Sequence, residues 1–256
     1  MSVINTNVKS LVASNALTVN ERFLSTAMEQ LSTGKRINSA KDDAAGMAIS
    51  SRMTSQIRGL DQAVRNANDG ISMLQTADGA MEEVSNMLQR MRELSVQYAN
   101  DTNASNDLVA LSTEFDALNS EISRIGAETS WNSIVIFGET AIAIQVGADA
   151  DETISMDIAS ITITADISDI ATLDTDINAL NTTRSTLGAN INRLTYAANN
   201  ALNVSQNTSA SRSRIMDTDY AKTSAELART QIVQQAATAM LAQANQSSQS
   251  VLALLK

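Results

Sequence analysis

Residues 53–74 read MTSQIRGLDQAVRNANDGISML, and their apolar side chains recur at alternating steps of four and three. The same spacing returns between residues 170 and 201, where Arg184 occupies one of the apolar positions. Stripes this narrow and this long predict helices that pack against partner helices along their whole length, as in a coiled coil. The stripe residues are Met53, Ile57, Leu60, Val64, Ala67, Ile71 and Leu74, then Ile170, Leu173, Ile177, Leu180, Leu187, Ile191, Leu194, Ala198 and Ala201. Arg184 either extends to water or pairs with an acid on an adjacent helix.

The composition argues against several classes of partner and location. Only 3% of the 256 residues are aromatic, which leaves a compact globular core short of bulky side chains. The formal charge of −10 disfavours nucleic acid or an anionic membrane surface as the main partner. Cysteine is absent, which excludes disulfides and thiolate sites. No apolar run approaches the roughly 18 residues that span a bilayer. Residues 1–10 lack the apolar stretch of a secretory signal, so we expect any export to use another route.

Catalytic chemistry has little support in the sequence. The chain has no histidine, which excludes HExxH zinc sites and Ser-His-Asp triads. Ser32 and Lys35 match the Ser-x-x-Lys spacing of penicillin-binding enzymes, but the accompanying motifs are missing. The acids around Asp149 lack the twelve-residue spacing of a calcium loop and favour a solvated turn. We therefore expect no enzyme activity, no metal and no cofactor.

The order of patterns along the chain predicts a mainly α fold. A first arm covers residues 1–33, and a polar break follows in which Ser39, Asp42 and Asp43 indicate a helix start. The expected elements after the break are a long helix to about residue 99, a helix with apolar positions from 108 to 125, strands at 142–146 and 154–158, a possible further strand at 161–164, a helix at 169–208, and a last arm at 221–255. Antiparallel pairing of the two long coiled-coil-like helices would place the terminal arms side by side, with a small β-hairpin region at about 135–165.

Several long strings resemble bacterial flagellin, the filament subunit of the flagellum. They lie at both ends and in the middle of the chain, in the family's order. The strings are INTN (4–7), LSTGKRINSAKDDAAGMAIS (31–50), LQRMRELSVQYAN (88–100), IQVGADADETI (144–154), RSTLGANINRL (184–194), SRIMDTDYA (213–221) and QANQSSQSVLALLK (243–256). The chain departs from many relatives at Asn132-Ser133, where they carry an Asn-Gly turn.

The resemblance implies a structural subunit that is exported unfolded and polymerises at the distal tip of the extracellular, motile filament. It implies a terminal-arm domain (1–42 with 213–256) in an inner tube and a helical rod domain (43–212), without a large outer domain. The implied partners are other copies of the chain, hook-associated and filament-cap proteins, an export chaperone and the flagellar type III export apparatus. Two alternatives stay open. One is a hook–filament junction protein, and the other is a soluble helical adaptor, which would need a closed core and no unpaired apolar arms.

We expect the arms and the polar break to contact neighbouring subunits. The break is either a merely solvated helix start or a subunit contact. The expected interface residues are Leu17, Leu24, Leu31, Arg36, Asn38, Asp42, Asp43, Met240, Leu241, Val251, Leu254 and Leu255. Arg90, Leu94 and Glu114 match family positions associated with detection by the vertebrate Toll-like receptor for flagellin. Packing between subunits is the alternative reason for those three residue types.

Overall fold

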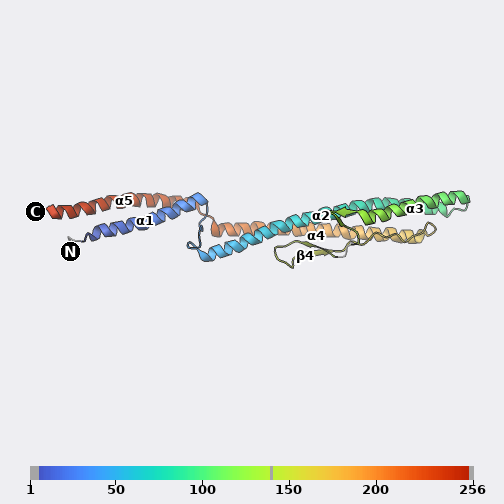
Figure 1. The fold of residues 1–256 in the computed structure, drawn as a ribbon, viewed down its shortest axis with the longest axis horizontal. Coiled ribbons are helices and arrows are strands. Elements are labelled where there is room, and N and C mark those ends of the chain that lie inside the picture. The colour runs from blue at the N-terminus through green and yellow to red at the C-terminus, as the bar shows by residue number, and fades with distance from the viewer. Residues whose placement is uncertain (1–5, 139–140, 254–256) are drawn as a thin grey trace. The chain divides into compact units, whose positions relative to one another are not determined.

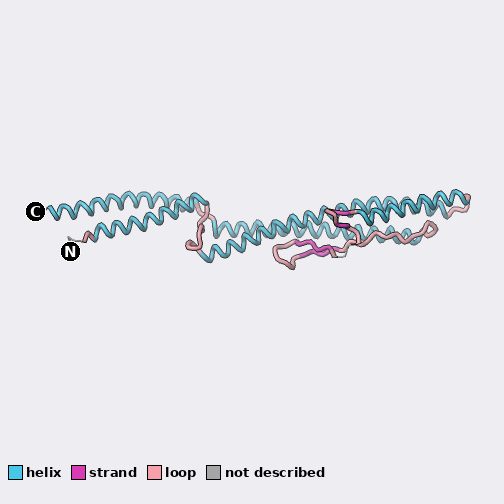
Figure 2. Tube along the Cα trace, viewed as in Figure 1, coloured by secondary structure: helices cyan, strands magenta, loops and turns pink. Residues whose placement is uncertain are grey.

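The computed structural model describes residues 6–138 and 141–253, which divide into two compact units. The arm unit comprises residues 1–54 and 208–256, and the rod unit comprises residues 55–207. Both consist mainly of helices, and the strands belong to the rod unit (Figures 1 and 2). No helix in the described part of the chain is long and apolar enough to cross a membrane.

Two antiparallel helices, α1 (Val8–Thr33) and α5 (Tyr220–Ala253), lie side by side in the arm unit (Figure 1). Asn7 caps α1 by accepting the Ser10 N–H, and its own side-chain amide donates to the Ala244 carbonyl at 3.1 Å. Gly34 ends α1 in the left-handed conformation, and its N–H donates to the Gln30 carbonyl. The predicted pairing of the terminal arms is confirmed.

Two long helices, α2 (Ala44–Tyr98) and α4 (Ile170–Met216), contribute residues 55–98 and 170–207 to the rod unit, where they run antiparallel. Three contacts fix their register: Arg92 with Asp174, Asp78 with Arg184, and Asp61 with Ser205. The Arg184 side chain therefore pairs with an acid on the adjacent helix, which decides between the two alternatives left open by the sequence. The third helix, α3 (Ser105–Glu128), folds back beside the C-terminal part of α2 (Figure 1).

Parts of both apolar stripes of the sequence contribute to the rod core. The buried side chains of α4 include Leu173, Leu187 and Leu194, which pack against α2 residues such as Leu74 and Leu88. Burial of side chains of this size contributes about 1.5–3 kcal/mol each. The predicted coiled-coil-like pairing of long helices is confirmed.

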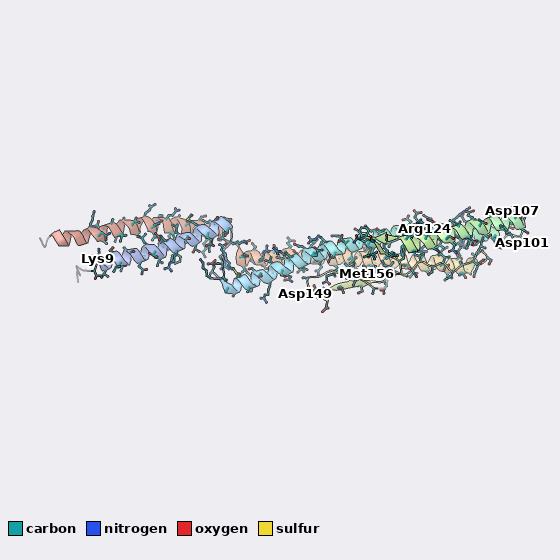
Figure 3. All side chains as sticks on the ribbon, in the orientation of Figure 1. Lys9, Asp101, Asp107, Arg124, Asp149 and Met156 are labelled. Carbon is teal, nitrogen blue, oxygen red and sulfur yellow. The ribbon has the colours of Figure 1, made fainter. Side chains whose placement is uncertain are left out.

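A β-hairpin packs on the helices of the rod. Strands β3 (Ile142–Gln145) and β4 (Thr153–Met156) pair antiparallel with Ile144 opposite Ile154, and Met156 is buried in the core (Figures 2 and 3). The hairpin comes so close to α2 that a Cβ added to Gly59 would lie 3.0 Å from the Ala148 Cβ atom. Glycine inside a helix costs about 1 kcal/mol relative to alanine, and the close approach of the hairpin explains its presence here.

A second, smaller hairpin was not predicted. Strands β1 (Ser130–Trp131) and β2 (Ile134–Val135) are joined by Asn132 and Ser133, whose φ angles are 47° and 67°. Positive φ at both central residues is typical of a type I′ turn, whose twist matches that of antiparallel strands. The turn therefore forms without glycine at either central position.

The structure differs from the sequence-based expectation at one possible strand and at the end of one helix. The expected strand at 161–164 does not form, because the Asp176 carboxylate accepts the N–H groups of Thr164 and Ala165 instead of a neighbouring strand. Helix α4 also continues to Met216 instead of ending near residue 208, because the serines and arginines of that stretch do not interrupt a helix. The break before α5 is thereby shortened to Asp217–Asp219.

Candidate interaction surface

Large apolar side chains are exposed along the α1–α5 hairpin. They have between 42% and 66% of their surface accessible, although each lies within a regular helix. We call these residues the arm face: Val8, Leu11, Val12, Phe23 and Met28 on α1, with Ile232, Val233 and Met240 on α5. Large apolar side chains left in water on a helical hairpin are typical of a site of protein–protein contact.

The seam between α1 and α5 buries small and polar residues instead of large apolar ones. The buried side chains of α1 are Asn20 and Ala27, and those of α5 outside residues 247–253 are Thr223 and Thr230. The Asn20 side-chain amide donates to the Thr230 carbonyl at 2.8 Å. The hairpin thus has a specific polar contact at its centre, but it buries little apolar surface of its own.

Two shallow grooves run between α1 and α5 on the arm face. The first is lined by Val8, Val12, Ala16, Ala237 and Met240, with Lys9 and Gln243 among its other residues. The second is lined by Val12, Val19, Phe23, Thr230 and Val233, with Glu226 and Arg229 among its other residues. Both grooves are apolar along most of their length, which suits the side of another helix.

The predicted interface residues of the arms differ in their exposure. Leu17, Leu24 and Leu31 are half-buried, as is Leu241, whereas Met240 is exposed. Val251 belongs to α5, but its side chain lies outside the described residues, and so do Leu254 and Leu255.

The polar break between α1 and α2 is internally hydrogen-bonded. The Arg36 guanidinium donates to the Ile215 carbonyl near the end of α4, at 2.6 and 3.1 Å. The Asp42 carboxylate accepts the N–H groups of Asn38 and Ser39, and the Ser39 N–H in particular lowers the Asp42 pKa. Asp43 caps α2 by accepting the Gly46 N–H at 2.8 Å. The break is therefore held in place by hydrogen bonds. The residue that caps α2 is Asp43, not Ser39.

Arg90, Leu94 and Glu114 lie at the contact of α2 with α3. The Arg90 guanidinium donates to Glu114 at 2.9 Å and to Glu93 at 3.0 Å, and both Arg90 and Glu114 are exposed. Leu94 is only 1% exposed and belongs to the rod core. The structure therefore brings these three residues together but presents only the two charged ones at the surface.

Exposed apolar residues of the rod were missed by the sequence-based reasoning. They are Val96, Val109, Trp131, Ile134, Val135, Tyr196 and Leu202. Each is isolated in the sequence or lies in a strand of two residues, so no periodicity distinguishes it from a core residue. Among residues 6–138 and 141–253, no three carboxylates cluster in a way that could hold a metal ion.

Comparisons with known proteins match both ends of the chain. The model of the bacterial flagellin N-terminal helical region matches residues 4–141, and that of the C-terminal helical region matches residues 170–255. A flagellin of Halalkalibacterium halodurans is 45% identical over 99% of this chain and 100% of its own. A flagellin of Xenorhabdus nematophila is 41% identical over 100% of this chain and 99% of its own.

Longer relatives match as well. Polar flagellin F of Vibrio parahaemolyticus is 33% identical over 98% of this chain and 99% of its own, in an alignment of 374 residues. Because this chain has 256 residues, a large part of the Vibrio protein has no counterpart here. The crystal structure of Bacillus cereus flagellin is 32% identical and covers 54% of this chain and 88% of that one, with a TM-score of 0.49.

Proposed function

This chain belongs to the bacterial flagellin family, and we propose that its arm face is the surface through which each subunit joins the flagellar filament. The chain is a structural subunit that self-assembles into this filament, and family membership implies an extracellular location. The matched relatives are flagellins, which gives no support to a junction protein or a soluble adaptor. The remaining question is which residues perform the assembly.

The observation that carries the proposal is the contrast between the side chains that the α1–α5 hairpin buries and those that it leaves exposed. Its seam buries Asn20, Ala27, Thr223 and Thr230, while the arm face leaves valine, leucine, phenylalanine and methionine in water. Removing such a side chain from water stabilises an assembly by on the order of 1–2 kcal/mol when it is already partly covered. Neighbouring subunits would supply the burial that the isolated hairpin lacks. The half-buried Leu17, Leu24 and Leu31 would complete these contacts, with residues 1–42 and 213–256 forming an inner tube.

Seeded elongation tests this proposal directly. Purified subunits are added to filament fragments, and elongation is followed by sedimentation and negative-stain microscopy. Met240→Asp is expected to abolish elongation, because a carboxylate would be buried without a partner. Met240→Leu is the matched control, since it keeps an apolar side chain at the same site and is expected to elongate normally. Normal elongation by Met240→Asp, with an unchanged helical circular dichroism signal, would refute the assembly role of the arm face.

A cytoplasmic chaperone would also bind the arm face before export. The α5 residues Ile232, Val233, Ala236, Ala237, Met240, Leu241 and Ala244 follow helical spacing, and the two largest exposed ones are Ile232 and Met240. A helical partner lying on them would cover apolar surface and block premature polymerisation. Changing Met240 and Leu241 together to Asp is expected to weaken chaperone binding and elongation in parallel. Loss of elongation with unchanged chaperone binding would show that the two surfaces differ.

Other partners follow from family membership as parts of the same proposal. Export through the flagellar type III apparatus and contacts with hook-associated and filament-cap proteins would accompany assembly. For the vertebrate Toll-like receptor, the exposed Arg90 and Glu114 would make direct contact, and the buried Leu94 would act only by supporting α2 beneath them. Arg90→Ala is therefore expected to reduce receptor activation more than Leu94→Met, which conserves the core volume.

A further inference from the structure

The methionines of this chain fall into very different environments. Met81, Met91 and Met156 are at most 2% exposed and lie in the rod core, where helices and the β3–β4 hairpin enclose them. Met28 and Met240 are 56% and 65% exposed, and both belong to the arm face. Met47, Met53, Met87 and Met216 are half-buried. Because thioether oxidation depends on access of the oxidant, Met28 and Met240 are expected to react faster than the enclosed methionines of the rod.

Met240 also occupies a position where a change of polarity has consequences. It lines the first groove of the arm face together with Val8, Val12, Ala16 and Ala237. A thioether suits such a groove because it is flexible and apolar. A sulfoxide at the same place would present a strong hydrogen-bond acceptor to a surface that offers it apolar side chains.

We propose that Met240, with Met28 as a second position, is an oxidation site at which peroxide prevents free subunits from joining the filament. The inference rests on the proposed assembly role of the arm face. The thioether sulfur attacks one peroxide oxygen, the O–O bond breaks, and an S–O bond forms. Sulfur is oxidised by two electrons to the sulfoxide, and hydrogen peroxide is reduced to water. Methionine sulfoxide reductases reverse the modification.

Because the exposed methionines lie in the arms and the enclosed ones in the rod core, peroxide is expected to modify the arms without modifying the rod core. Oxidation of Met28 and Met240 leaves the rod core intact, because its thioethers stay enclosed while the rod is folded. The oxidised subunit therefore keeps its rod fold but presents a polar group on the arm face. Burying that group against a neighbouring subunit without a hydrogen-bond partner is unfavourable, so elongation stops at the subunit that carries it.

The experiment treats soluble subunits with dilute hydrogen peroxide, quenches the reaction with free methionine, and compares peptide mass mapping with seeded elongation. The expected result is that Met28 and Met240 gain oxygen at least tenfold faster than Met81, Met91 and Met156. Elongation is expected to fall in proportion to Met240 sulfoxide, with unchanged thermal unfolding of the rod, and to recover after treatment with reductase. Met240→Leu is expected to lose most of the peroxide sensitivity and Met28→Leu/Met240→Leu the rest, whereas the matched variant Met156→Leu is expected to remain as sensitive as the parent chain.

Two results would overturn the inference. One is normal elongation by subunits whose Met240 is completely oxidised. The other is equal peroxide sensitivity in the parent chain and in a Met28→Leu/Met240→Leu variant. Elongation by the Met240→Asp variant without peroxide shows whether the oxidation inference or the assembly proposal is at fault. If that variant does not elongate while oxidised parent subunits do, only the oxidation inference is wrong, and if it elongates normally, the assembly role of the arm face is wrong.

Discussion

The side-chain amide of Asn20 donates to the carbonyl oxygen of Thr230, 2.8 Å away, and both residues are buried between α1 and α5. A buried amide in a helical seam selects one register, because any shift leaves it without a partner. The Thr230 hydroxyl donates back to the Glu226 and Leu227 carbonyls of its own helix, which holds the Thr230 side chain in place. The arm hairpin is thus aligned by a buried polar contact while its large apolar side chains remain available.

Removal of this contact is expected to loosen the arms without affecting the rod. Asn20→Ala should destabilise the α1–α5 pairing by about 1 kcal/mol, the usual contribution of one such hydrogen bond. Hydrogen exchange of α1 and α5 amides measures the change, and rod amides should exchange as before. Asn15→Ala, at an exposed position on the same helix, is the matched control. Equal protection of α1 in both variants would show that Asn20 does not align the hairpin.

Both ends of the free subunit are expected to be the first regions cut by a protease. The fully buried side chains of the arm seam are small or polar, so the hairpin opens at a lower free energy than the leucine-rich rod. Brief proteolysis, followed by mass spectrometry, should leave a stable fragment of roughly residues 45 to 210. Assembled filaments should be cut much more slowly at the same enzyme concentration. Survival of intact arms in the free subunit, beyond cleavage of the rod, would contradict this expectation.

The Arg92–Asp174 pair is expected to make rod stability depend on acidity. A hydrogen bond from the Arg92 side chain, 2.6 Å long, lowers the pKa of Asp174 below its ordinary value. Because the folded-state pKa is the lower one, this contribution is present above the unfolded value of about 3.9 and is lost as pH falls through the folded value. The melting temperature of the parent chain should therefore fall between about pH 5 and pH 2.

The matched variants isolate this contribution. Asp174→Asn should lower the melting temperature slightly at neutral pH and reduce its fall in acid. Asp69→Asn, at an exposed position of α2, is the matched control. Both are measured by circular dichroism at several pH values. Identical acid profiles for Asp174→Asn and the parent chain would exclude a role for this pair.

The sequence predicted the long elements because their signals are local and repeated. The stripe from Met53 to Leu74 can be recognised from a helical period alone, and in α2 its residues are buried or half-buried. Asn20 carries no such signal, since a lone polar residue in an arm could equally face water. Strands β1 and β2 have two residues each, too few to show alternation. The predicted strand at 161–164 failed because its partner is the Asp176 side chain, which a local pattern cannot reveal.

The β1–β2 turn contains an unfavourable residue that can be improved. Ser133 has a φ of 67°, a conformation that costs an L-residue about 1 kcal/mol and that glycine adopts freely. Ser133→Gly should therefore raise the free energy of unfolding of the rod by up to about 1 kcal/mol. Urea titration of the subunit measures it. Ser130→Gly, in the adjoining strand, should instead destabilise the rod, and stabilisation by both changes would rule out turn strain as the cause.

A side chain at Gly34, at the end of α1, is expected to destabilise the arm unit. The Gly34 φ of 71° is left-handed, and a Cβ added there would lie 2.9 Å from the Tyr220 hydroxyl oxygen at the start of α5. Gly34→Ala therefore introduces both backbone strain and a steric contact, which together should destabilise the arm unit by about 1–2 kcal/mol. Tyr220→Phe removes the contacting oxygen. The double variant Gly34→Ala/Tyr220→Phe should therefore lose the part of the destabilisation that is due to the steric contact and keep the part that is due to backbone strain. Hydrogen exchange of α1 and α5 amides in the four proteins of this double-mutant cycle measures the coupling. Additive effects of the two changes would show that Gly34 is required only for its backbone conformation.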